Sequence, residues 1–129
     1  MKRPTVQWLD RRISAPGPYL TLCMSEAEFR AALAPLAPPS VPAWMTRGAD
    51  ATTHFFDNQD KKTCAFVCLA DPKYRNAIEI AGLLVHEAVH VWQQHCLDIG
   101  ERHPGDEQEA YAVQSIAQEL LAEYARRLG

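Results

Sequence analysis

Short apolar runs separated by polar segments mark the first half of the chain and predict a small β-sheet there. Residues 19–24 (Tyr-Leu-Thr-Leu-Cys-Met) are apolar, aromatic or β-branched in the main, which favours a strand. Two further strands are predicted at 51–56 and 63–70, and the polar loop 57–62 joins them as a hairpin. The run at 63–70 is apolar on both faces, which predicts an interior strand covered on each side.

A short helix is predicted between the first strand and the hairpin. Ser25 and Glu28 have the spacing of a capping box, with Ser25 as N-cap and Glu28 at the third helical position. The helix should run to about Leu33, because the prolines that follow cannot continue it. A proline-rich connection over residues 34–48 then leads to the hairpin.

Helical periodicity dominates the second half of the chain. Asp71-Pro72 predicts a helix start, and this helix should run to about Asp98 with Gly100 as its stop. Apolar residues on most of its sides indicate that it is the central helix of the domain. A last helix is predicted from about 106 to 127, with one apolar face that packs on the central helix. That face consists of Ala110, Val113, Ala117, Leu120, Leu121 and Tyr124.

Composition and charge narrow the class of protein. The chain has 129 residues, 47% of them apolar, which is enough for one domain with a core. The net charge is −3 and there is no dense basic stretch, so we expect no nucleic-acid partner. No apolar run reaches the roughly 18 residues of a membrane span. The first twenty residues lack the apolar stretch of a secretory signal, so we expect a cytoplasmic location and no membrane association.

The cysteines are expected to be structural. Cys23, Cys64, Cys68 and Cys96 lie in a chain without an export signal, which favours reduced and mostly buried thiols. Cys64 and Cys68 are four residues apart and do not form a Cys-x-x-Cys pair. A second zinc site made from the cysteines is the alternative.

The residues that carry chemistry lie inside the predicted central helix. His86-Glu87-Ala88-Val89-His90 has the pattern His-Glu-x-x-His. Residues four apart share a helix face, so His86 and His90 can direct imidazole nitrogens at one zinc ion. Glu87 lies about 100° round the helix axis, where it can take a proton from water beside the metal. A hairpin before the motif and a helix after it follow the order of a zincin catalytic core.

A catalytic zinc also needs a third protein ligand and an open position. The candidates downstream of the motif are His95, Glu101, His103, Asp106, Glu107 and Glu109. His95 is five residues past His90, so the same helix points it elsewhere, whereas His103 lies in a loop. The carboxylates at the start of the last helix are favoured, because that helix folds back against the motif helix.

Residues 107–111, Glu-Gln-Glu-Ala-Tyr, resemble the Glu-x-x-Ala-(Asp/Asn) signature of small gluzincin metallopeptidases. These include the ImmA/IrrE-like family and similar compact phage and prophage proteins. The resemblance implies that Glu107 is the third zinc ligand. Glu109 is the alternate ligand, although with Asp106 as N-cap it would occupy a capping-box position. The chain departs from the signature at Tyr111, where the family has an Asp or Asn that orients a zinc-bound histidine.

Together the motifs and the resemblance predict an α+β fold. We expect one zincin-like domain over 1–129, with a small sheet (the hairpin plus an N-terminal strand) packed on the central motif helix and the C-terminal helix. Residues 1–18 should be extended or poorly ordered. The expected activity is zinc-dependent hydrolysis of a protein or peptide substrate, with Glu87 as general base. Tyr74, His103 and Tyr111 are candidates to stabilise the oxyanion.

Two other functions stay open. A catalytically weak zinc-binding interaction module of phage or prophage origin would keep the metal without turnover. A helical adaptor would bind no metal.

Overall fold

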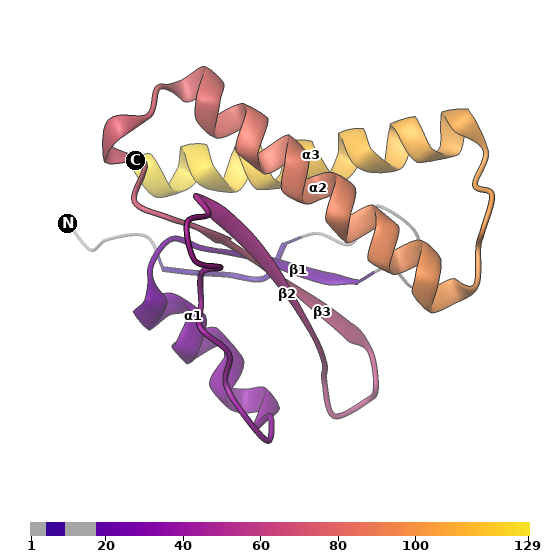
Figure 1. Cartoon of the computed structure of the whole chain (residues 1–129), viewed down its shortest axis with the longest axis horizontal. Helices are drawn as coiled ribbons and strands as arrows, with labels where there is room; N and C mark the ends of the chain where they lie inside the picture. Colours follow the sequence, from indigo (N-terminus) through magenta and orange to yellow (C-terminus); the bar gives the residue numbers. More distant parts are fainter. Residues whose placement is uncertain (1–4, 10–17) are drawn as a thin grey trace.

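A three-stranded sheet separates one short helix from two long helices (Figure 1). The structure is a computed structural model, and it describes residues 5–9 and 18–129. The elements in chain order are β1 (Tyr19–Cys23), α1 (Glu26–Leu33), the 3₁₀ turn η1 (Ala34–Leu36), β2 (Ala51–Asp57), β3 (Thr63–Leu69), the 3₁₀ turn η2 (Pro72–Tyr74), α2 (Ala77–Ile99) and α3 (Asp106–Leu128). The predicted α+β class is therefore confirmed.

The strand order is β1-β3-β2, with β3 in the middle. β1 lies parallel to β3, with Thr21 opposite Phe66, and β2 lies antiparallel to β3, with Thr53 opposite Val67. All residues of β3 after Thr63 are buried, which confirms the predicted interior strand. In the sheet formed by the described residues, β2 is an edge strand.

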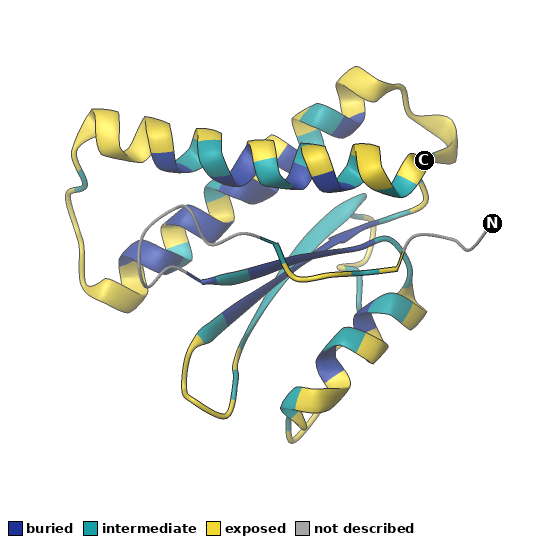
Figure 2. Cartoon of the chain, turned by 180° about the vertical axis from the view of Figure 1, so that it is seen from behind, coloured by how far each residue is buried: buried dark blue, intermediate teal, exposed yellow. Residues whose placement is uncertain are grey.

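Alternate residues of β3 enter two separate cores. Ala65, Val67 and Leu69 pack with apolar residues of α2 and α3. Cys64, Phe66 and Cys68 face the opposite way and pack with Phe29 and Leu33 of α1. Figure 2 shows the two long helices on one side of the sheet and the short helix on the other. The sheet is thus the middle layer of three, which is why its central strand is apolar on both faces.

α1 begins and ends where the sequence predicts. The Ser25 side chain is the N-cap and its Oγ accepts a hydrogen bond from the Glu28 amide at 3.1 Å. The Glu28 carboxylate accepts from the amide of Met24 at 2.9 Å, one residue before the position that a capping box uses. The helix ends at Leu33, and the proline-containing turn η1 follows.

The predicted start of the central helix at Asp71 is wrong. Asp71 does accept a hydrogen bond from the Lys73 amide, but it caps only the turn η2. Arg75 then adopts an extended conformation (φ −123°, ψ 143°), which interrupts any helix from Pro72 onward. α2 starts at Ala77, after a complete capping box made by Asn76 and Glu79.

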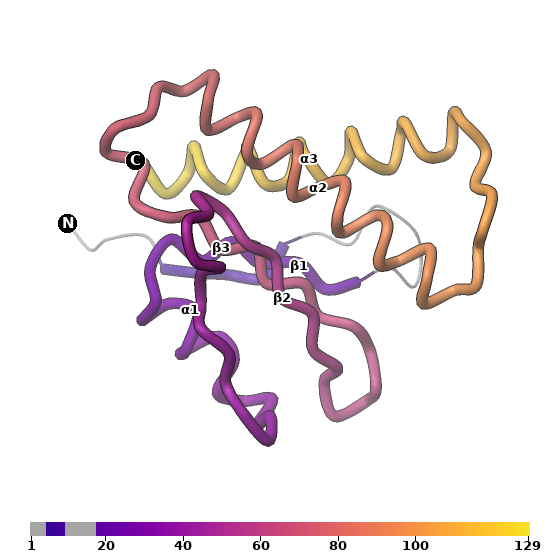
Figure 3. The backbone as a smooth tube through the Cα atoms, in the orientation of Figure 1, coloured from indigo at the N-terminus to yellow at the C-terminus, as the bar shows by residue number. Residues whose placement is uncertain are grey.

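The predicted end of α2 is confirmed. Gly100 follows Ile99 in the left-handed conformation (φ 72°), where a residue without a side chain is favoured. The chain can therefore turn sharply and return as α3, as the backbone trace in Figure 3 shows.

α3 lies against α2, but two details differ from the prediction. Gly105 precedes the helix as N-cap and Asp106 is its first residue, so Asp106 is not the cap. The buried face is also rotated from the predicted one, since Ala110 is exposed. The buried residues of the helix are Ala112, Ile116, Ala117, Leu120 and Glu123.

The N-terminal prediction can be followed only in part. Residues 1–4 and 10–17, on which most of the expected extended or poorly ordered segment falls, lie outside the described residues. Residues 5–9 run beside β1: the Leu9 amide donates to the Leu20 carbonyl at 2.8 Å, and Trp8 forms a bridge with Thr21. As predicted, no helix in the described ranges is long and apolar enough to cross a bilayer.

Candidate metal centre

α2 brings His86 and His90 together on its exposed face. Their Nε2 atoms lie 3.1 Å apart, and the ring centroids are separated by 4.8 Å. Two imidazole ligands of a tetrahedral zinc, each about 2.0–2.1 Å from the ion, have nitrogens about 3.3 Å apart. The pair therefore fits two positions of a zinc site, as the spacing in the sequence predicts.

Glu87 lies beside the pair but is buried, with only 4% of its surface exposed. Its Oε2 accepts a hydrogen bond from the Thr53 hydroxyl on β2 at 3.2 Å. A carboxylate removed from water needs such a donor to stay oriented. The hydrogen bond fixes the carboxylate between the motif helix and the edge strand.

His86, Glu87 and His90 share the wall of one cavity of about 480 Å³. Two stretches of chain face α2 across it, the loop before β2 and β2 itself. The lining residues are Thr46, Ala49, Ala51, Thr52, Thr53, Phe55, His86, Glu87, His90, Gln93, Gln94 and Leu97. The histidine pair thus opens onto a space bordered by the edge strand.

Gln93 contacts His90 on the side away from the pair. Its Oε1 lies 3.3 Å from His90 Nδ1, so a proton on Nδ1 would be donated to the amide and would leave Nε2 free as a ligand. Gln93 and Thr53 are site residues that were not predicted from the sequence. Gln93 lies three residues after His90 on one helix, and this spacing could have indicated it. The contact of Thr53 with Glu87 could not be predicted in this way, because it depends on how β2 is placed against α2 in the fold.

The third-ligand candidates are not gathered at the pair. Among the described residues, no group of three His, Cys, Asp or Glu side chains is arranged to hold one metal ion. Glu107 lies exposed on the first turn of α3 and does not line the cavity of His86 and His90. All four cysteines are buried thiols, as predicted. A hydrogen bond with Cys23, and then burial, raises the pKa of Cys68 above its usual range and keeps that thiol neutral.

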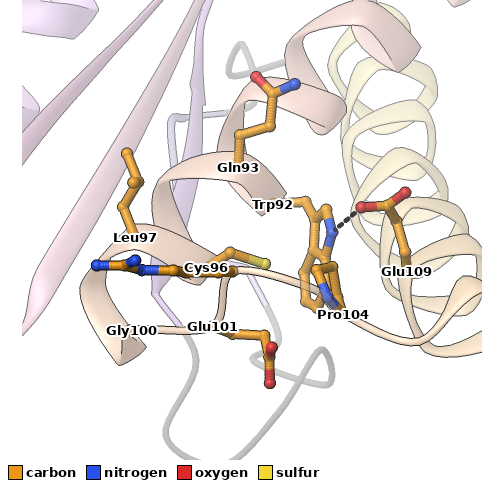
Figure 4. Close-up of a pocket in the computed structure, with 9 residues that line it drawn as sticks. Trp92, Gln93, Cys96, Leu97, Gly100, Glu101, Pro104 and Glu109 are labelled. Carbon is orange, nitrogen blue, oxygen red and sulfur yellow. Dashed lines mark hydrogen bonds between the residues drawn. The ribbon is translucent and has the colours of Figure 1, made fainter.

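Glu109 has a different role from the one predicted. Its carboxylate accepts a hydrogen bond from Trp92 Nε1 at 2.9 Å and lines a second cavity at the end of α2 (Figure 4). The predicted capping-box role is wrong, because Gly105 rather than Asp106 is the N-cap.

The remaining candidates lie away from the pair. His95 is buried beside Trp92, so it points away from the exposed histidines, as predicted. His103 lies in the exposed loop before α3. Tyr74 and Tyr111 are largely exposed and do not line the cavity, so the structure does not bring an oxyanion donor from this set to the site.

Comparisons of the chain with protein-family models, with curated proteins and with solved structures find no match. The function is therefore inferred from the geometry of the site.

Proposed function

We propose that this chain is a zinc-dependent metallopeptidase with a gluzincin-like site on a zincin-like fold. One observation carries the proposal: two imidazole nitrogens lie 3.1 Å apart on successive turns of one helix, beside a buried glutamate. Two histidines with a purely structural role do not need a buried carboxylate beside them. Hydrolysis does need one, because the carboxylate serves as the general base. The short Glu-x-x-Ala resemblance at residues 107–110 points to the same class.

His86 and His90 would hold the ion through Nε2, and Gln93 would orient His90. Zinc supplies a polarising charge that lowers the pKa of water to about 7 and stabilises an oxyanion. Glu87 takes up the proton of the attacking water and returns it to the leaving amine. Oε2 of that carboxylate already accepts a hydrogen bond from Thr53, so we assign the proton to Oε1.

The substrate would be an extended peptide lying along β2. An edge strand offers unpaired backbone groups to a further strand. β2 is an edge strand of the sheet that the described residues form, and it borders the same cavity as the histidine pair. A peptide added there would run past His86 and His90.

Metal content and peptide cleavage test the proposal together. Purified protein should bind about one zinc per chain, and His90→Ala should lose it, while His103→Ala, which changes an exposed histidine of the loop, should keep it. Glu87→Gln should retain the zinc and lose cleavage of a broad peptide library by about a hundredfold or more.

The outcomes separate the three functions. Zinc lost in His90→Ala together with cleavage lost in Glu87→Gln supports the peptidase. Zinc binding without any cleavage by the unaltered protein favours the weak interaction module and overturns the peptidase. Equal zinc content in the unaltered protein and His90→Ala excludes this site as the metal centre.

A further inference from the structure

A second cavity, of about 630 Å³, lies at the carboxyl end of α2. It is enclosed by the last turns of α2, the loop that follows Gly100 and the first turn of α3. Its walls combine apolar side chains with carboxylates; they include Trp92, Cys96, Leu97, Pro104, Glu101 and Glu109. Figure 4 shows Glu109 reaching the edge of the Trp92 indole, where the hydrogen bond is drawn.

Both carboxylates in the wall are oriented by neutral donors. Glu109 accepts from the indole N–H of Trp92 at 2.9 Å, and Glu101 accepts from the backbone amide of His103 at 3.0 Å. Neither forms an ion pair with any described residue, although Arg102 also lines the cavity. Within the described ranges, both carboxylates are therefore held by neutral donors and not by an ion pair.

Cys96 shares the wall of this cavity with the two carboxylates. Burial raises the pKa of Cys96, and the negative charges of Glu109 and then Glu101 raise it further. Both carboxylates thus act on the same side chain of the pocket. Two carboxylates and one cationic side chain, Arg102, line the cavity, and this balance favours a positive group over a negative one.

This cavity adjoins the candidate metal centre. Gln93 and Leu97 line both cavities, and they follow His90 along the exposed face of α2. The seven residue steps from His90 to Leu97 span about 10 Å of helix. That distance equals about three residues of extended peptide.

We propose that the second cavity binds a basic side chain, lysine or arginine, of the peptide substrate, about three residues from the bond at the histidine pair. The inference rests on the proposed function for its biological role. The aliphatic stem would lie against Trp92, Leu97 and Pro104, and the charged end would approach Glu101 and Glu109. Long basic side chains have the required division into an apolar stem and a charged tip.

Binding of small blocked peptides to the metal-free protein tests the pocket apart from zinc and turnover. The probes are the amide-blocked tripeptides Ala-Lys-Ala, Ala-norleucine-Ala and Ala-Glu-Ala, followed by NMR at the Trp92 indole resonance, which Trp92→Phe assigns. The lysine peptide should shift this resonance at about fivefold lower concentration than the norleucine peptide, which has a similar stem without charge. The glutamate peptide should bind more weakly than both.

Two double variants decide whether the carboxylates cause the preference. Glu101→Gln with Glu109→Gln should abolish the lysine preference, while the amide at 109 can still accept from Trp92. Glu26→Gln with Asp60→Asn removes the same charge from α1 and the hairpin loop and should leave the preference intact. Equal affinity for the lysine and norleucine peptides, or a preference that survives the first double variant, overturns the proposal. Because no metal is present, failure of the peptidase leaves this measurement interpretable.

Discussion

Two glutamates show how one residue type acquires different roles from its hydrogen-bond donor. Glu87 is held by the hydroxyl of Thr53 beside the histidine pair, and Glu109 by the indole of Trp92 in the neighbouring cavity. Each bond fixes one oxygen, so each carboxylate keeps a defined direction. Glu107 is exposed on the first turn of α3, where acidic residues are favoured by the helix dipole.

The roles of Glu107 and Glu109 can be separated by comparing zinc binding with stability. Glu107→Ala should weaken zinc binding by about tenfold or more if Glu107 is the third ligand, with little effect on metal-free stability. Glu109→Ala leaves the buried indole N–H of Trp92 without its partner, so it should cost about 1–2 kcal/mol of unfolding free energy. Calorimetric zinc titration and urea denaturation measure the two effects. Unchanged zinc affinity in Glu107→Ala would remove it from the ligand set.

At the scale of the element, the first residue of α2 is set by a complete capping box. Asp71-Pro72 and Asn76-x-x-Glu79 are both start signals, and the first has the residue types most typical of a helix entry. In the fold, the extended conformation of Arg75 separates them, so Asp71 caps only one turn. Asn76 and Glu79 satisfy one another's backbone donors and open the long helix.

This difference predicts unequal effects of removing the two caps. Asn76→Ala should cost about 1 kcal/mol of unfolding free energy, because amides of the first turn of α2 lose their acceptor. Asp71→Ala, in a turn of three residues, should change it by less than about 0.5 kcal/mol. Urea denaturation followed by far-ultraviolet circular dichroism measures both variants. A larger loss in Asp71→Ala than in Asn76→Ala would contradict this assignment of the helix start.

The contrast between α2 and α3 indicates what a single sequence can predict. His86 and His90 come together because four residues make about one helical turn, which needs no knowledge of the fold. The positions of Glu107 and Glu109 depend on how α3 is rotated against α2. Its apolar periodicity did not fix that rotation, since alanines lie on both its buried and its exposed faces. The strands were predictable because β3 is apolar throughout, although the parallel pairing of β1 with β3 was not.

At the scale of the whole molecule, the sheet places the candidate site at an edge between layers. β3 is covered on both faces, whereas β2 lies at an edge of the sheet that the described strands form and borders the cavity of the motif helix. The histidines face outward from α2, and their partner Glu87 faces inward to the sheet. Metal binding at the pair should therefore act on the stability of the entire fold, because the same helix carries the main core.

Zinc should raise the thermal stability of the folded protein. A ligand that binds only the folded state at a hundred times its Kd contributes about 2.7 kcal/mol. For a chain of this length the unfolding entropy near 60 °C converts that energy into a Tm increase of about 10 °C. Differential scanning calorimetry with zinc, and then with an added chelator, measures the increase and its reversal.

The matched control is the double variant His86→Ala with His90→Ala. Both side chains are exposed, so the metal-free Tm should change little. Unfolding exposes the four cysteines, which are all buried in the folded chain and also bind zinc, so zinc should leave the Tm of the variant unchanged or lower it. The sign of the zinc effect should thus reverse or vanish when the pair is removed. An equal Tm increase in both proteins would mean that the folded state binds zinc away from α2.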